Sequence, residues 1–191
     1  VMVCQDGFIT SHAVEALETF PKEEVQKFIG SYELPYSLLD VENPVTYGPL
    51  DLQDYYFEHK RQQSEAMAKA YERIPGVVKE FKETFGSEYD FLELYRMDDA
   101  ETAVVALGST AGTVKSTVDG LREQGWKVGL VKMNFFRPFP AEELRKALSP
   151  LKAVGVLDRA EGFSNQGGPM LSEIQGAMYN SEAKPPIADY I

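Results

Sequence analysis

Thr102-Ala-Val-Val-Ala-Leu107 is a short apolar run, and it leads directly into the glycine-containing segment Gly108-Ser-Thr-Ala-Gly-Thr113. Apolar residues then recur at offsets of four and three over residues 114–121, which is the spacing of one helix face. A second apolar run follows at residues 128–133. Strand, helix and strand in this order predict a parallel α/β unit with a right-handed crossover. Because ligands of parallel sheets bind at the carboxyl ends of the strands, residues 108–113 are a candidate binding loop.

The same pattern continues to the end of the chain. Pro140 opens a predicted helix that includes Leu144 and Leu148, and a third apolar strand follows at residues 153–157. Residues 170–179 have a helical pattern, and a fourth strand is expected to begin at Ile187. An edge strand is expected at residues 91–95. We therefore predict an α/β fold with a parallel sheet over residues 101–191.

Composition narrows the class of protein. The chain has 191 residues, 43% hydrophobic and 26% charged, as in ordinary globular proteins. Its net charge of −11 argues against non-specific nucleic-acid binding, which needs a basic face. Cys4 is the single cysteine, so neither an internal disulfide nor an iron–sulfur cluster bound by this chain alone is expected. No signal peptide or membrane-spanning run is visible, so we expect a cytoplasmic protein with no membrane or nucleic-acid partner.

The first hundred residues have a different character. Residues 1–4 form an apolar run that predicts a buried strand, and a helix capped by Thr10 or Ser11 is expected after it. Residues 20–57 are rich in proline and aromatic residues and predict irregular chain that buries its rings against another surface. We interpret this part as the tail of a larger domain. The alternative is a compact N-terminal subdomain whose strand 1–4 pairs with the main sheet.

Two helices are expected between this part and the α/β unit. Residues 58–74 are rich in helix formers, whereas Pro75-Gly76 predicts an interruption. Apolar residues then recur at a spacing of four over residues 77–85, and Gly86 is a typical helix end.

Three loops are candidate sites, and each has a structural alternative. Residues 108–113 match neither of the common phosphate-binding glycine motifs and contain no lysine, so a tight turn capped by Ser109 or Thr110 is favoured over a phosphate site. Gly167-Gly168 permits close approach of a ligand or of another protein surface. Asp158-Arg159 ends a strand, where active residues often lie, although an ion pair or a loop clamp is the more common explanation.

Histidine chemistry is sparse in this chain. His12 and His59 lie far apart and have no cysteine or carboxylate at metal-ligand spacing, so no metal site is predicted. Thr10, Ser11 and His12 place two hydroxyls and an imidazole together, where they could face a ligand. A helix cap beside a hydrogen-bonded histidine is the alternative. We identify no catalytic residue, because no complete catalytic arrangement is visible.

Several strings resemble the 2-oxoacid:ferredoxin oxidoreductases, and most of all the α subunits of the pyruvate-oxidising members. Residues 6–12, Asp-Gly-Phe-Ile-Thr-Ser-His, are similar to a D-G-F-x-T-S-H segment of that family. Four further stretches match in order and spacing, namely Pro49-Leu-Asp51 with Tyr55-Tyr-Phe57, Leu107-Gly-Ser-Thr110, Gly129-Leu-Val-Lys132 with Phe136-Arg-Pro-Phe139, and Val156-Leu-Asp-Arg159.

The resemblance implies a thiamine diphosphate-dependent reaction that needs Mg²⁺. A 2-oxoacid is decarboxylated, iron–sulfur clusters in partner subunits pass electrons to ferredoxin, and coenzyme A accepts the acyl group. It implies that residues 1–58 end a thiamine-pyrimidine-binding domain, 59–100 form a helical linker, and 101–191 resemble the C-terminal domain of transketolase. Thr10, Ser11 and His12 become candidate cofactor-binding residues.

The same resemblance implies that the activating glutamate and the substrate-holding residues lie upstream of Val1. The chain alone is therefore expected to be inactive, as part of a complex with β, γ and δ type subunits. Two alternatives stay open, namely a free-standing α/β ligand-binding domain with residues 108–113 as its pocket, and a structural module for subunit assembly.

Overall fold

The structure is a computed structural model that describes residues 2–7, 9–163 and 165–191. Expectations for Val1, Phe8 and Ser164 lie outside the described residues. The chain divides into two compact units, one formed by Val1–Val14 with Tyr89–Ile191 and the other by Glu15–Glu88.

The first unit contains a five-stranded sheet in the order β1-β3-β2-β4-β5. The strands are β1 (Leu92–Tyr95), β2 (Thr102–Leu107), β3 (Val128–Met133), β4 (Ala153–Leu157) and β5 (Ile187–Tyr190). β2 pairs in parallel with both β3 and β4, β4 pairs in parallel with β5, and β1 is an antiparallel edge strand beside β3. The predicted α/β fold and all five predicted strands of this region are confirmed.

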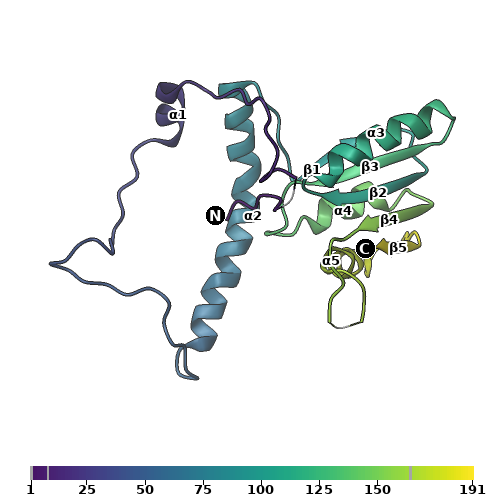
Figure 1. The fold of residues 1–191 in the computed structure, drawn as a ribbon. Helices are drawn as coiled ribbons and strands as arrows, with labels where there is room; N and C mark the ends of the chain where they lie inside the picture. The colour runs from purple at the N-terminus through teal and green to yellow at the C-terminus, as the bar shows by residue number, and fades with distance from the viewer. Residues whose placement is uncertain (1, 8, 164) are drawn as a thin grey trace. The chain divides into compact units, whose positions relative to one another are not determined.

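Helices cover both faces of the sheet (Figure 1). Helix α3 (Thr110–Glu123) packs on β2 and β3, whereas α4 (Ala141–Leu148) and α5 (Pro169–Met178) pack against each other on the opposite face. Of the expected apolar helix positions, Val114 and Val118 are buried on α3 and Leu144 and Leu148 on α4, whereas Leu121 is partly buried. Because β3 is covered on both sides, five of its six residues are buried, which explains its continuous apolar sequence. The α3 side of the core contains Ala106, Ala111, Val114, Val118, Val128 and Leu130.

The second unit contains two helices, α1 (Lys22–Ile29) and α2 (Tyr56–Phe85). The rings of Phe20 and Phe28 pack on Phe81 and Phe85, with centroids 4.4–5.8 Å apart. The predicted apolar face is therefore confirmed at Phe81 and Phe85, whereas Val77 is 54% exposed. Helix α1 lies in a stretch that we predicted to be irregular, because the surrounding sequence is rich in proline. The stretch nevertheless contains this eight-residue helix, and Phe28 packs it against α2.

The predicted interruption at Pro75-Gly76 is wrong, because α2 continues through Pro75. Proline removes one backbone donor from the helix ladder. Good helix formers on its N-terminal side and the packed phenylalanines on its C-terminal side outweigh that loss.

The predictions for the first twenty residues are also wrong where the structure describes them. Met2–Cys4 form no strand and Val3 is 91% exposed, and no helix follows at Thr10 or Ser11. A lone strand has unpaired backbone groups on both sides, so an apolar run without a neighbouring strand is not stabilised in extended pairing. The alternative pairing of strand 1–4 with the main sheet is not found among the described residues either.

Residues 30–55 contain no helix or strand. The predicted irregular chain is confirmed here, but the expected burial of its rings is not found within this unit. Its exposed large apolar side chains are Tyr32, Leu34, Tyr36, Leu38, Leu39, Val41, Tyr47, Leu50, Leu52 and Tyr55.

Candidate functional site

The candidate site lies at the edge of the sheet where β2 and β4 end. From β2 the chain passes through α3 to β3 on one side, and from β3 through α4 to β4 on the other side. β2 and β4 run parallel, but the order in which strands are added to the sheet reverses between them. Open α/β sheets bind ligands in the crevice at such a switch point. Ser109 follows the end of β2, and Arg159 follows the end of β4. We call this edge the carboxyl edge.

The carboxylate of Asp6 occupies this position. Arg159 donates from Nη1 to Oδ1 of Asp6 at 2.8 Å, and the Ser109 hydroxyl donates to Oδ2. The Asp6 side chain is 6% exposed. A buried carboxylate is unfavourable unless charged or polar donors compensate for lost water, and both kinds of donor are present here. We call Asp6, Ser109 and Arg159 the carboxyl-edge cluster.

Asp6 also organises its own segment, the Asp6 turn (residues 6, 7 and 9–13). Its carboxylate accepts from the amide of Ile9 at 3.4 Å, and its carbonyl accepts from the amide of Ser11 at 3.2 Å. The amides of His12 and Ala13 donate to the carbonyl of Ile9 at 3.2 and 2.9 Å. One carboxylate therefore joins the local turn to the ends of two strands.

The turn places Thr10, Ser11 and His12 next to one another on the surface. Ser11 Oγ lies 2.7 Å from Nδ1 of His12 and donates to the carbonyl of Gly7. All three residues are exposed. A hydroxyl and an imidazole in contact can donate hydrogen bonds to a polar heterocycle and accept hydrogen bonds from it. The cofactor-binding role of Thr10, Ser11 and His12 stays a prediction.

The loop after β2 is the tight turn that the sequence favoured, but its capping differs. Helix α3 begins at Thr110, and no described side chain caps its first turn. The Ser109 hydroxyl instead donates to Asp6. The predicted cap by Ser109 or Thr110 is therefore wrong, because a buried carboxylate competes for the hydroxyl.

The segment after β4 forms a second polar junction at the same edge. Asp158 accepts hydrogen bonds from the amides of Met170 and Leu171 at 3.0 and 2.9 Å, so it caps α5. Gly168 donates to Oδ2 of Asp189 at 2.7 Å, while Oδ1 of Asp189 is buried without a partner among the described residues. A Cβ on Gly168 would collide with Asp158. The two glycines therefore let the backbone approach two carboxylates of this chain, those of Asp158 and Asp189. Asp158 acts as a loop clamp.

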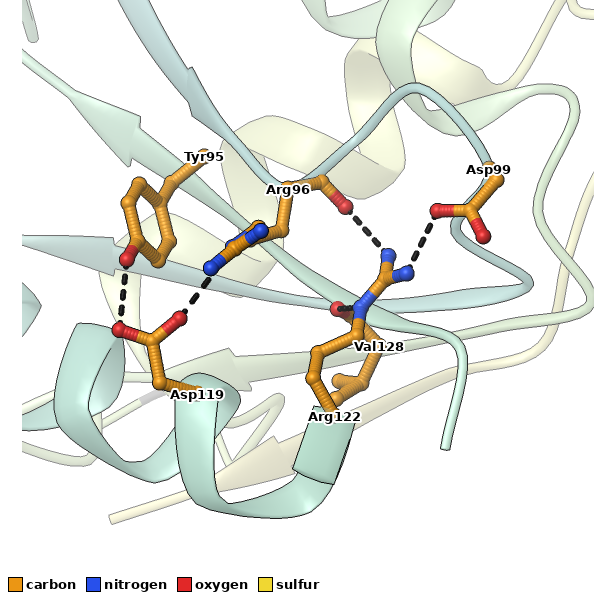
Figure 2. Close-up of polar contacts among 6 residues, drawn as sticks. All are labelled: Tyr95, Arg96, Asp99, Asp119, Arg122 and Val128. Carbon is orange, nitrogen blue, oxygen red and sulfur yellow. Dashed lines mark hydrogen bonds and ion pairs between the residues drawn. The ribbon is translucent and has the colours of Figure 1, made fainter. Parts of the chain in front are cut away.

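A different polar network lies at the opposite edge, where β2 and β3 begin (Figure 2). Arg122 donates to the carbonyls of Val128 and Arg96 at 2.7 and 2.6 Å, and to Asp99 at 2.5 Å. Arg122 thus fastens the end of α3 to the start of β3 and to the connection before β2. The hydrogen bond from Arg122 lowers the pKa of Asp99.

Asp119 completes this network. It accepts from the Tyr95 hydroxyl at 2.7 Å and from Nε of Arg96 at 3.2 Å. The Tyr95 bond and, after it, the Arg96 bond lower the pKa of Asp119. We call Tyr95, Arg96, Asp99, Asp119 and Arg122 the amino-edge cluster, and its bonds are those of a structural brace.

Sequence reasoning identified Arg159 by its place after a strand but missed Asp6 as its partner. Asp6 lies 103 residues from Ser109 and 153 from Arg159 in the chain, so no local pattern links them. In the sequence, Asp6 stood out only as the first residue of the stretch 6–12 that resembles the family.

The described ranges contain no group of three or more histidine, cysteine or acidic side chains arranged to hold a metal ion. Within the same ranges, no helix has the length and apolar character needed to cross a membrane.

Two family models match the chain in succession. Residues 1–79 match "Pyruvate flavodoxin/ferredoxin oxidoreductase, thiamine diP-bdg", and residues 100–191 match "Pyruvate:ferredoxin oxidoreductase core domain II". A solved 2-oxoglutarate:ferredoxin oxidoreductase from Magnetococcus marinus is 20% identical, with a TM-score of 0.41, over 64% of this chain and 20% of that one. That likeness is too distant to support an argument.

Curated relatives match over the same length. The pyruvate synthase subunit PorA of Thermotoga maritima is 53% identical over the whole chain and 48% of its own length. The ketoisovalerate oxidoreductase subunit VorA of Pyrococcus abyssi is 40% identical over the same shares, and PorA of Methanocaldococcus jannaschii is 39% identical over 95% of this chain and 47% of its own. The chain thus spans about half the length of these relatives. It belongs to the 2-oxoacid:ferredoxin oxidoreductase family.

Proposed function

We propose that this chain is part of the α subunit of a pyruvate:ferredoxin oxidoreductase. The observation that supports this most is the 53% identity to a pyruvate synthase subunit along all 191 residues. In this proposal the intact enzyme converts pyruvate and coenzyme A to acetyl-CoA and CO₂, and ferredoxin takes up the two electrons. Partner subunits of the β, γ and δ type contribute the iron–sulfur clusters, and the complex works in the cytoplasm.

We propose a division of labour among three stretches of the chain. Residues 1–58 end the domain that faces the thiamine pyrimidine, residues 59–100 connect, and residues 101–191 form the transketolase-like α/β domain. Bound thiamine diphosphate, with its Mg²⁺, would stabilise the carbanion left by decarboxylation. The exposed hydroxyls and imidazole of Thr10, Ser11 and His12 suit hydrogen bonds to a nitrogen heterocycle, so these residues would bind and orient the pyrimidine.

This chain supplies binding and orientation rather than the catalytic groups. Thiamine diphosphate also carries a diphosphate group, which Mg²⁺ would help to hold as a magnesium–diphosphate unit. In the proposal, that unit and the residues that hold the substrate belong to other parts of the enzyme.

Substrate choice is the point on which the relatives differ. The chain is more similar to a pyruvate synthase subunit than to a ketoisovalerate oxidoreductase subunit, at 53% against 40% identity. This favours pyruvate, with a branched 2-oxoacid as the second candidate.

The test is purification of the whole complex that contains this sequence. We expect reduction of ferredoxin or a viologen dye that requires pyruvate, thiamine diphosphate and coenzyme A. 2-Oxoisovalerate should be used less efficiently, and the 191-residue chain alone should be inactive. A complex that turns over neither acid would favour the ligand-binding or assembly alternatives, and turnover by the chain alone would refute the division of labour.

A direct test of the three site residues uses the same complex. Thr10→Val and His12→Gln should weaken the apparent affinity for thiamine diphosphate, measured by titrating activity after cofactor removal. His59→Gln is the matched control, because His59 pairs with Asp51 at 2.5 Å in the other compact unit. Equal affinity in all variants would remove Thr10 and His12 from the site.

A further inference from the structure

The carboxyl-edge cluster joins residues that the two family models assign to different regions. Asp6 lies within the thiamine-binding match over residues 1–79, whereas Ser109 and Arg159 lie within the match over residues 100–191. The Asp6 carboxylate is nonetheless almost fully buried in contact with both. The contact therefore crosses the boundary between the two matched regions.

The place of this contact is the position where α/β domains usually receive a ligand. Ser109 follows β2 and Arg159 follows β4, the two strands that flank the switch point. Ser109 contacts Asp6 in preference to capping α3. A hydroxyl and a guanidinium that converge there form a receptor for a carboxylate, and the chain supplies that carboxylate itself.

We propose that Ser109 and Arg159 are positioning residues that act through Asp6. By holding the Asp6 carboxylate, they fix the Asp6 turn, which places Thr10, Ser11 and His12 on the surface. The crevice of the α/β domain thus serves as the docking site for the thiamine-binding segment. The cofactor role of the three residues rests on the proposed function, but the docking itself does not.

The first experiment measures the turn directly, by hydrogen exchange and mass spectrometry on the purified complex. The amides of Ile9, Ser11, His12 and Ala13 are hydrogen-bonded within the turn. Asp6→Asn and Arg159→Ala should raise exchange in peptides that cover residues 9–13 by roughly threefold to tenfold, because a charge-assisted bond is lost at a partly exposed site. Ser109→Ala should produce a smaller rise.

Two comparisons make this measurement specific. Arg159→Lys should restore part of the protection, since it keeps the charge but not the guanidinium geometry. Arg137→Ala is the control, because Arg137 pairs with Glu173 in the same unit. In the double variant that combines Asp6→Asn and Arg159→Ala, the rise in exchange should be smaller than the sum of the two single rises. Each single variant already removes the same Arg159–Asp6 interaction.

The second experiment separates positioning from simple stability. If the proposed function holds, Arg159→Ala should raise the concentration of thiamine diphosphate needed for half-maximal activity, while kcat at saturating cofactor changes less. Arg159→Lys should recover part of that affinity.

The outcomes distinguish the two proposals. If the complex shows no thiamine-dependent activity but Arg159→Ala loosens residues 9–13, the proposed function fails and the docking stands. If exchange over residues 9–13 in Asp6→Asn and Arg159→Ala matches that of Arg137→Ala, the docking proposal is overturned, whatever the activity. Where Arg159→Ala does not fold, Arg159→Lys and Ser109→Ala decide by the same criterion.

Discussion

The two edges of the sheet are both rich in polar contacts, but they draw on different parts of the chain. At the amino edge, the residues of Figure 2 all lie between Tyr95 and Val128, and they fasten α3 to the elements beside it. At the carboxyl edge, Asp6 reaches residues 103 and 153 positions away. The amino-edge cluster joins neighbouring elements, so its bonds stabilise the local fold. The carboxyl-edge cluster includes a residue from a remote segment, so its bonds also fix the position of that segment.

The largest expected effect tests the tightest packing at the carboxyl edge. Gly168 has a φ of −77°, which any residue adopts, so a substitution there acts through space alone. Gly168→Ala would drive a methyl group into the Asp158 carboxylate and displace the cap of α5. We expect a loss of about 3 kcal/mol or more in the free energy of unfolding, measured by urea denaturation.

The same helix offers a matched control for that change. Gly176 lies inside α5, and a Cβ there would meet nothing within 4 Å. Gly176→Ala should therefore stabilise the protein by about 0.5–1 kcal/mol, through helix propensity. Equal effects of the two substitutions would show that Gly168 is not sterically required.

The amino edge is tested at Arg122. Arg122→Ala removes two bonds to backbone carbonyls and one to Asp99, and it takes this donor from the carbonyl of the buried Val128. We expect a loss of about 2–3 kcal/mol, with Arg122→Lys intermediate because lysine lacks the planar fork.

The control for Arg122 is Arg61→Ala in α2, where Arg61 forms an exposed pair with Glu65. That change should cost less than about 0.5 kcal/mol. If Arg122→Ala were as mild as Arg61→Ala, the amino-edge cluster would not brace the fold.

The smaller effect at the carboxyl edge concerns the cap of α5. Asp158→Ala removes acceptors for the amides of Met170 and Leu171 and should destabilise by about 1–2 kcal/mol. Asp158→Asn keeps one acceptor oxygen and should cost less. A larger loss for asparagine than for alanine would contradict the capping role.

The structure that could be predicted from the sequence is the part that depends on local sequence. The part that depends on contacts between remote segments could not be predicted. The strands at 102–107, 128–133 and 153–157 were predictable because each carries buried positions, and burial favours apolar residues there. Met2–Cys4, the described part of the apolar run, have similar composition but no pairing strand. Composition alone does not reveal that a neighbouring strand is missing. Helix α1 and the passage of α2 through Pro75 depend on packing between phenylalanines far apart in sequence.

The candidate site shows the same limit. Gly108-Ser109 and Asp158-Arg159 were predictable as strand ends, and strand ends lie together in a parallel sheet. The contact of Asp6 with them was not predictable, because the donors of a buried carboxylate depend on the tertiary structure and not on nearby sequence. The Ser109 hydroxyl accordingly bonds to Asp6 and does not cap α3, the role that local sequence predicted for it.

The last and smallest expected effect is the acid response of the amino edge. The hydrogen bonds from Tyr95 and then Arg96 hold the pKa of Asp119 below its ordinary value of 3.8 in the folded state. Asp119 therefore contributes its stabilisation fully above pH 3.8, and loses it as the pH falls through the lower folded value. Because the carboxylate is solvent-exposed, we expect only a small part of the acid sensitivity to come from it. Asp119→Asn should slightly flatten the fall in unfolding free energy between neutral pH and pH 3, measured by urea titration at each pH. A steeper fall in Asp119→Asn would reverse the sign assigned to the Tyr95 bond.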